Sequence, residues 1–111
     1  MGRFGKRRDK TANLASYYEK CPETLEQVGG LDEPDLSYEF HVLGVWRYKP
    51  TGDLYWTTDS GCSCPSPFED DYFYGPEDTS LDCSKEDLRK AIADFPCDEI
   101  SKRQLRELCG L

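Results

Sequence analysis

The sequence has no apolar run long enough to cross a membrane, because none approaches the roughly 20 residues that a spanning helix needs. The basic start is not followed by a continuous apolar stretch over residues 11–21, so we expect no signal peptide. Internal repeats and low-complexity segments are also missing. These absences predict a cytoplasmic protein, made in a reducing compartment, with no membrane among its partners.

Basic residues are scarce outside the first ten positions. The chain of 111 residues has 14 Lys and Arg against 22 Asp and Glu, for a net charge of −8. Five bases and one acid fall in residues 1–10, so this segment carries +4 and residues 11–111 carry −12. An acidic body repels phosphates, which argues against nucleic-acid binding except through residues 1–10. We predict a flexible basic tail over residues 1–13 and a single domain over residues 14–111.

Six cysteines are present, but only Cys62 and Cys64 form a local pair. Structural zinc needs four ligands, usually from two pairs with two to four residues between the cysteines. The remaining ligands here would have to come from His41, Cys83, Cys97, Cys21 or Cys109. The simpler interpretation is that the cysteines are small buried hydrophobes of a reduced protein that holds no cofactor. A zinc-stabilised module built on Cys62 and Cys64 is the alternative.

The single histidine limits the case for an enzyme. His41 lies inside a predicted strand, where a histidine is usually a surface or packing residue. Residues 59–61 lack the G-x-S-x-G pattern of a serine hydrolase. No Lys or Arg lies between residues 53 and 85, so the cation that favours a reactive thiolate is missing there. We therefore predict a protein that is not an enzyme, with a thiol-dependent enzyme using Cys62 or Cys64 as the alternative.

Alternating apolar residues predict a β-hairpin over residues 38–58. One face of its first strand carries Tyr38, Phe40, Val42, Trp46 and Tyr48. The second face is mixed, so we expect a helix to cover part of it. Residues 49–53 form the turn, because they contain Pro and Gly, and residues 54–58 return as the partner strand.

The flanking segments have weaker patterns. Residues 14–28 are weakly helical, and residues 31–36 form an acidic loop. A long loop is expected over residues 59–76, with a short strand at residues 72–74. A loop of this length is more often functional than merely connective.

Two capping patterns predict helices near the end of the chain. Ser84 caps the first, and its buried stripe is Leu88, Ala91, Ile92 and Phe95. Ser101 caps the second, which ends at Gly110 and buries Leu105, Leu108 and Cys109. The predicted fold class is α+β, with a small antiparallel sheet built on the 38–58 hairpin and two C-terminal helices packed on one face.

Aromatic and acidic residues gather in and beside the long loop. Tyr and Trp are favoured at protein interfaces because they supply a large contact area with few rotatable bonds. An acidic module that binds a protein partner is therefore the leading functional prediction. Its predicted binding surface is Tyr55, Phe68, Glu69, Asp70, Asp71, Tyr72, Phe73 and Tyr74.

One continuous run of residues is distinctive. It reads Thr-Asp-Ser-Gly-Cys-Ser-Cys-Pro-Ser-Pro-Phe-Glu over residues 58–69, preceded by Leu-Tyr-Trp at residues 54–56. Together with Tyr-Glu-Phe at residues 38–40 and Val-Trp at residues 45–46, this run resembles a family of small uncharacterised proteins encoded by phages and prophages of actinobacteria. The resemblance covers about a third of the chain. It implies an accessory phage protein that acts in the host cytoplasm, and it implies no catalytic residue.

Overall fold

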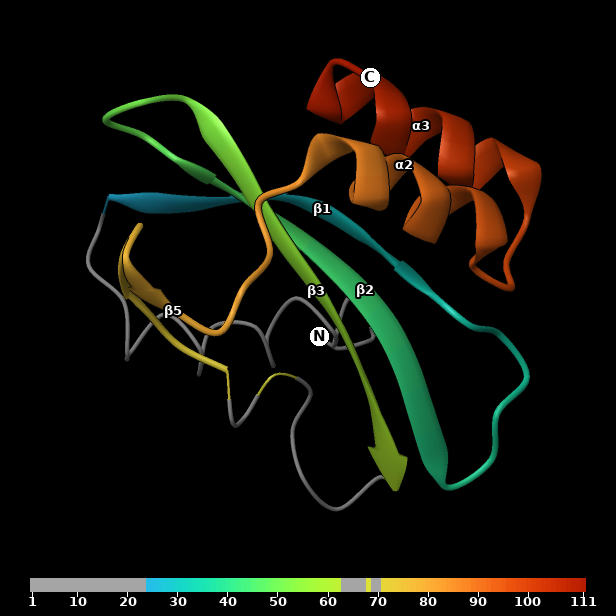
Figure 1. Cartoon of the computed structure of the whole chain (residues 1–111). Helices are drawn as coiled ribbons and strands as arrows, with labels where there is room; N and C mark the ends of the chain where they lie inside the picture. The colour runs from blue at the N-terminus through green and yellow to red at the C-terminus, as the bar shows by residue number, and fades with distance from the viewer. Residues whose placement is uncertain (1–23, 63–67, 69–70) are drawn as a thin grey trace.

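A three-stranded antiparallel sheet forms the centre of the molecule (Figure 1). The computed structural model describes residues 24–62, 68 and 71–111. The strands are β1 (Leu25–Asp32), β2 (Glu39–Tyr48) and β3 (Asp53–Cys62), in the order β1-β2-β3. Two helices near the end of the chain pack on the sheet, so the predicted α+β class is confirmed.

The predicted hairpin is present and longer than expected. Strand β2 pairs with β3 from Tyr48 opposite Asp53 to Glu39 opposite Cys62. Gly52 adopts φ +80° in the turn, a conformation that glycine reaches without steric strain. Strand β3 continues to Cys62 rather than ending at residue 58, so the first part of the predicted long loop is a strand.

Strand β1 corrects the weak helix prediction over residues 25–28 and the loop prediction over residues 31–32. Leu25 and Leu31 are six residues apart, and in a regular strand they would lie on one face. A register shift between Gln27 and Gly29 places them in the clusters on opposite faces of the sheet. The resulting spacing of apolar residues resembles that of an amphipathic helix, which explains the incorrect helix prediction.

Both faces of β2 are buried. The alternating set that begins at Phe40 packs with the segment after β3, in a cluster of Leu25, Phe40, Val42, Trp46, Tyr55, Phe68, Phe73 and Leu81. The other set faces the helices, in a cluster of Leu31, Leu43, Val45, Leu54, Leu88, Ile92, Phe95, Leu105 and Cys109. The predicted helical cover of the second face is confirmed. Tyr38 instead lies outside the strand and is 86% exposed.

Helix α2 (Lys85–Asp94) begins as predicted, because the side chain of Ser84 accepts a hydrogen bond from the backbone N–H of Asp87. Helix α3 (Glu99–Cys109) is capped by Asp98 and not by Ser101, whose N–H donates to the Asp98 carboxylate. Gly110 ends α3 in the left-handed conformation.

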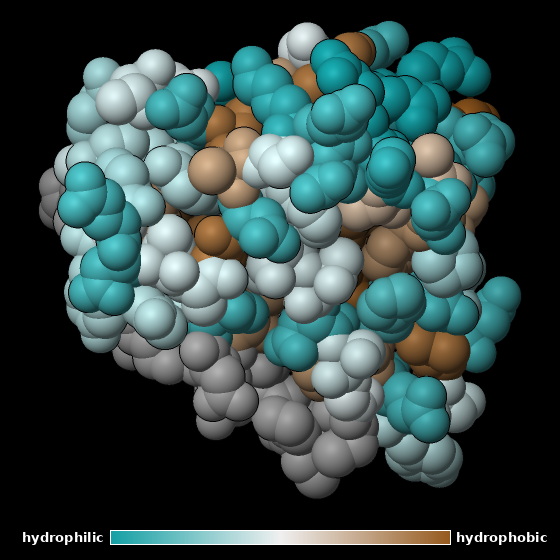
Figure 2. Space-filling model, viewed as in Figure 1, coloured by the Kyte–Doolittle hydropathy of each residue, from teal (hydrophilic) through white to brown (hydrophobic). Residues whose placement is uncertain are grey.

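Leu108 was expected to be buried in α3 and is 58% exposed. Leu105 and Cys109, four residues apart, are buried in this helix as predicted. Figure 2 shows mainly hydrophilic residues over the outer side of the helices. Within the described part of the chain, every helix is too short or too polar to span a membrane.

The second small sheet pairs β4 (Phe73–Gly75) with β5 (Asp78–Thr79). The strand predicted near residues 72–74 is therefore present, shifted by one residue. Phe73 and Leu81 belong to the cluster on the sheet face opposite the helices. The molecule thus has helices on one face of the main sheet and the β4–β5 hairpin on the other (Figure 1).

Candidate functional site

Asp59, a residue of β3, binds the backbone of Phe68, which follows the Cys62–Cys64 segment in the sequence. The backbone N–H of Phe68 donates to Oδ2 of Asp59 at 2.7 Å, and the N–H of Ser60 donates to Oδ1 at 2.9 Å. Phe68 has φ +64°, which is rare for a bulky residue, and its carbonyl accepts from the N–H of Asp71 at 3.1 Å. Asp59 therefore stabilises a strained turn nine residues away.

Phe68 is a core residue. Its ring meets that of Trp46 edge to face, with the centroids 5.2 Å apart, and only 2% of the residue is exposed. Gly44 provides the space for both rings, because a Cβ there would lie 2.7 Å from Trp46 and 3.0 Å from Phe68. The aromatic residue of the distinctive run is thus an anchor for the sheet.

The predicted binding surface is corrected at three positions. Tyr55, Phe68 and Phe73 are at most 5% exposed, so they cannot contact a partner in this fold. Burial, with smaller contributions from nearby Cys83 and Asp53, raises the pKa of the Tyr55 phenol. Their aromatic character drew them into the prediction, but the same character suits a core. Glu69 and Asp70 lie outside the described residues.

Three members of the predicted surface do reach the solvent. Tyr74 is 63% exposed, and Tyr72 and Asp71 are partly exposed. The rings of Tyr72 and Tyr74 lie together, with centroids 5.6 Å apart. We call Tyr72 and Tyr74 the tyrosine ridge. Phe73, between them in sequence, turns inward and is fully buried, as strand alternation requires.

The tyrosine ridge is held by hydrogen bonds to β5 and its flank. Ser80 Oγ accepts from the N–H of Tyr72 at 3.0 Å, and the Ser80 hydroxyl lies 2.9 Å from Oδ1 of Asp71. The carbonyl of Tyr72 accepts from the hydroxyl of Thr79 at 2.9 Å and from the N–H of Ser80 at 3.1 Å. A surface fixed in this way loses little conformational entropy on binding.

The ridge has acidic surroundings. Glu77, Asp78 and Asp82 are exposed on or beside the β4–β5 hairpin. The sequence from residue 54 to residue 84 contains no Lys or Arg. The tyrosine ridge therefore belongs to a stretch of sequence, residues 54–84, in which every charged residue is an acid.

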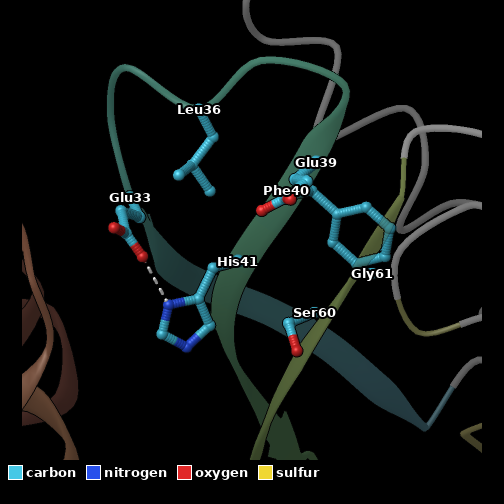
Figure 3. A pocket seen from close by; sticks show the side chains of 7 residues that line it. All are labelled: Glu33, Leu36, Glu39, Phe40, His41, Ser60 and Gly61. Carbon is cyan, nitrogen blue, oxygen red and sulfur yellow. Dashed lines mark hydrogen bonds and ion pairs between the residues drawn. The ribbon is translucent and has the colours of Figure 1, made fainter.

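A separate pocket of about 590 Å³ opens where β1 leads into β2 (Figure 3). Its lining is Glu33, Leu36, Glu39, Phe40, His41, Ser60 and Gly61. Nδ1 of His41 lies 2.8 Å from Oε1 of Glu33, and the imidazole packs against Phe95, the C-cap residue of α2, with centroids 4.6 Å apart. These two contacts fix the position of the only histidine.

Sequence reasoning did not identify Glu33 or Glu39 as pocket residues. The pairing of β1 with β2 is what brings the two residues together. After β1 the chain turns back through residues 33–38, which places Glu33 beside His41. Without β1 in the prediction, nothing placed an acid beside that histidine. Ser60 pairs with His41 in the β2–β3 register.

The structure describes only some of the proposed zinc ligands. Cys64 and the side chain of Cys62 lie outside the described residues. Cys83 follows Asp82, which pairs with Trp56, and Trp56 is about 20 Å from Cys62 along β3. Cys83 therefore cannot share an ion with Cys62, which corrects that part of the prediction.

Four other ligand candidates were named: Cys21 lies outside the described residues, Cys109 is buried in α3, and Cys97 and His41 remain as predictions. Cys97 and His41 both lie near Phe95, toward the same end of the sheet as Cys62. Among the described residues, no three His, Cys, Asp or Glu side chains cluster as a metal site would require. Zinc analysis of protein purified without chelator tests the Cys62 and Cys64 prediction directly.

Comparison with known proteins places the chain in a family. Residues 12–108 match the model of a domain of unknown function, DUF7574. The chain belongs to the DUF7574 family. Searches of curated proteins and of solved structures found no match. The DUF7574 match spans the three strands of the main sheet, the tyrosine ridge and all residues of the pocket.

Proposed function

We propose that this DUF7574 protein is a non-enzymatic accessory protein of phage origin that binds another protein in the host cytoplasm. The observation that carries the proposal is the exposed tyrosine ridge, whose two residues flank a fully buried Phe73. Tyrosines are enriched among the residues that dominate protein interfaces. The resemblance of residues 38–69 to phage-encoded proteins supports the origin and the compartment.

The partner is expected to present Lys or Arg to the ridge. Asp71, Glu77 and Asp78 adjoin the two tyrosines, and no base lies between residues 54 and 84. An acidic patch attracts a basic one and speeds their encounter at low salt. Arginine also stacks on tyrosine rings, so one side chain of the partner can use both features of the ridge.

Affinity capture tests this proposal. The full chain is immobilised, exposed to an actinobacterial lysate, and the captured protein is then purified and titrated against variants. Replacing both Tyr72 and Tyr74 by Ala removes the ridge, and Tyr38→Ala is the matched control because Tyr38 is an exposed tyrosine of the β1–β2 loop. We expect the double variant to lose at least about tenfold in affinity and the control to keep it. Equal affinity of the double variant and the wild type would remove the ridge as the binding surface.

A thiol-dependent enzyme is the second candidate, because Glu33 orients His41. In acyl-transfer enzymes a carboxylate holds the catalytic imidazole in this way. The alkylation rate of Cys62 and Cys64 by iodoacetamide, mapped by mass spectrometry, tests the idea. If His41 activates either thiol, His41→Ala slows its alkylation at neutral pH. Unchanged rates at both cysteines would leave the imidazole without this role.

A further inference from the structure

The pocket beside His41 has a lining that selects for a particular ligand chemistry. Among the described residues that line it, two are carboxylates, Glu33 and Glu39, and none is Lys or Arg. Leu36 and Phe40 supply the apolar part of the wall. A volume of about 590 Å³ lies within the range of small-molecule sites. We propose that this pocket binds a guanidinium group, carried by a free ligand or by an arginine side chain.

The hydrogen-bonding character of the pocket supports a ligand rich in donors. An ionised carboxylate can only accept, so Nδ1 of His41 is the donor in its contact with Glu33. In the neutral imidazole, Nε2 is then an acceptor. Glu33 and Glu39 thus present carboxylate acceptors to a ligand, and the hydroxyl of Ser60 can also accept. Guanidinium offers five N–H donors and no acceptor, which matches this set.

Geometry also favours an organic cation over a metal ion. Within the described ranges, no group of three His, Cys, Asp or Glu side chains is close enough to hold a metal. Figure 3 shows the side chains of Glu33, Leu36 and Glu39 distributed around a space rather than converging on one point. A planar cation with an apolar stem fits such a wall, since its head meets the carboxylates and its stem lies along Leu36.

The pocket is positioned by rigid elements. Phe40, His41, Ser60 and Gly61 belong to paired residues of β2 and β3. Phe95, the C-cap residue of α2, supports the imidazole from the helical side. Glu33 is fixed twice, since its N–H donates to the carbonyl of His41 at 2.9 Å and its carboxylate accepts from the imidazole. Little reorganisation is then needed when a ligand enters.

This site is distinct from the tyrosine ridge. The ridge lies on the β4–β5 hairpin, whereas the pocket lies at the opposite end of β3 from the β2–β3 turn, and Figure 1 separates the two regions clearly. The inference therefore goes beyond the proposed protein-binding surface. Failure at one site leaves the other unaffected.

Titration of the full, ¹⁵N-labelled chain with Nα-acetyl-arginine amide tests the inference. We expect saturable chemical-shift changes at Glu33, Glu39, His41 and Gly61. The citrulline analogue has the same shape without the charge, and it should cause no saturable change at these positions. The lysine analogue should bind more weakly than arginine, because an ammonium cannot present the planar fork of donors.

Two matched variants connect the binding to the carboxylates. Glu39→Gln should weaken arginine binding roughly tenfold, because a charge-assisted hydrogen bond is lost. Glu107→Gln, the same change at an exposed position of α3, should leave it unaltered. Unchanged thermal melting of Glu39→Gln shows that the fold is kept. Equal binding of citrulline, unaltered affinity in Glu39→Gln, shifts confined to the β4–β5 hairpin, or no saturable shift would each overturn the proposal.

Discussion

The backbone N–H of Phe68 donates to the carboxylate of Asp59 across 2.7 Å, and this contact brackets the segment that carries Cys62 and Cys64. Phe68 then fills the space between Trp46 and Gly44 in the core. Two residues of the distinctive run are therefore structural.

Loss of the Asp59 carboxylate should destabilise the fold. Asp59→Ala leaves the N–H of the left-handed Phe68 without its charged acceptor, and we expect the free energy of unfolding to fall by about 1–3 kcal/mol. Asp59→Asn keeps a neutral acceptor and should lose less. Urea denaturation of both variants measures the difference. If Asp59→Ala has the same urea denaturation midpoint as the wild type, Phe68 does not depend on this contact.

Gly44 should not tolerate a methyl group. A Cβ at this position would lie 2.7 Å from the ring of Trp46, so Gly44→Ala forces two packed aromatic rings apart and should cost about 1–3 kcal/mol. Gly75→Ala is the control, because a Cβ there meets no atom within 4 Å. Thermal melting compares the two variants. Similar melting temperatures would mean that the core around Trp46 is loosely packed.

Tyr38 is held in an unfavourable backbone conformation. Its φ is +63° and its side chain is 86% exposed, so it has little burial to offset the strain. Tyr38→Asn should stabilise the protein by up to about 1 kcal/mol, since Asn tolerates the left-handed region. Tyr38→Ala keeps a Cβ without this tolerance and should give no such gain. Chemical denaturation distinguishes the variants, and a destabilised Tyr38→Asn would contradict the strain argument.

The cap of α3 should make stability depend on acid pH. Hydrogen bonds from the backbone N–H and the hydroxyl of Ser101 lower the pKa of Asp98. A carboxyl with a lowered folded-state pKa stabilises the fold above its ordinary pKa of about 4, and the contribution is lost as pH falls through the lowered value. Asp98→Asn keeps a capping oxygen that does not titrate.

Melting curves of the wild type and Asp98→Asn between neutral and strongly acidic pH check this prediction. The wild type should be the more stable protein at neutral pH, and the two curves should converge in acid. A difference that stays constant down to low pH would mean that the charge of Asp98 contributes nothing.

The sequence was sufficient for features with local signals. Ser84 caps α2 as expected, and the alternation from Phe40 to Tyr48 correctly separated the two faces of β2. Strand β1 was missed because a bulge at Gln27–Gly29 changes which face its leucines occupy. A bulge is a property of strand pairing, so it has no reliable signature in one segment alone.

The candidate site was predicted in part for a related reason. Tyr72 and Tyr74 were identified, whereas Tyr55, Phe68 and Phe73 were placed on the same surface although they are buried. Composition cannot distinguish an aromatic core from an aromatic interface, because both need large apolar side chains. Only the register of β3 and the inward turn of Phe73 separate the two groups.

The most direct test of the proposed function is the footprint of the captured partner on this protein. Amide hydrogen exchange, measured with and without the partner, reports which residues the complex covers. The account predicts new protection at residues 71–80, around the tyrosine ridge, and none over the outer side of α3. Protection confined to the helices, with exchange unchanged at Tyr72 and Tyr74, would contradict it.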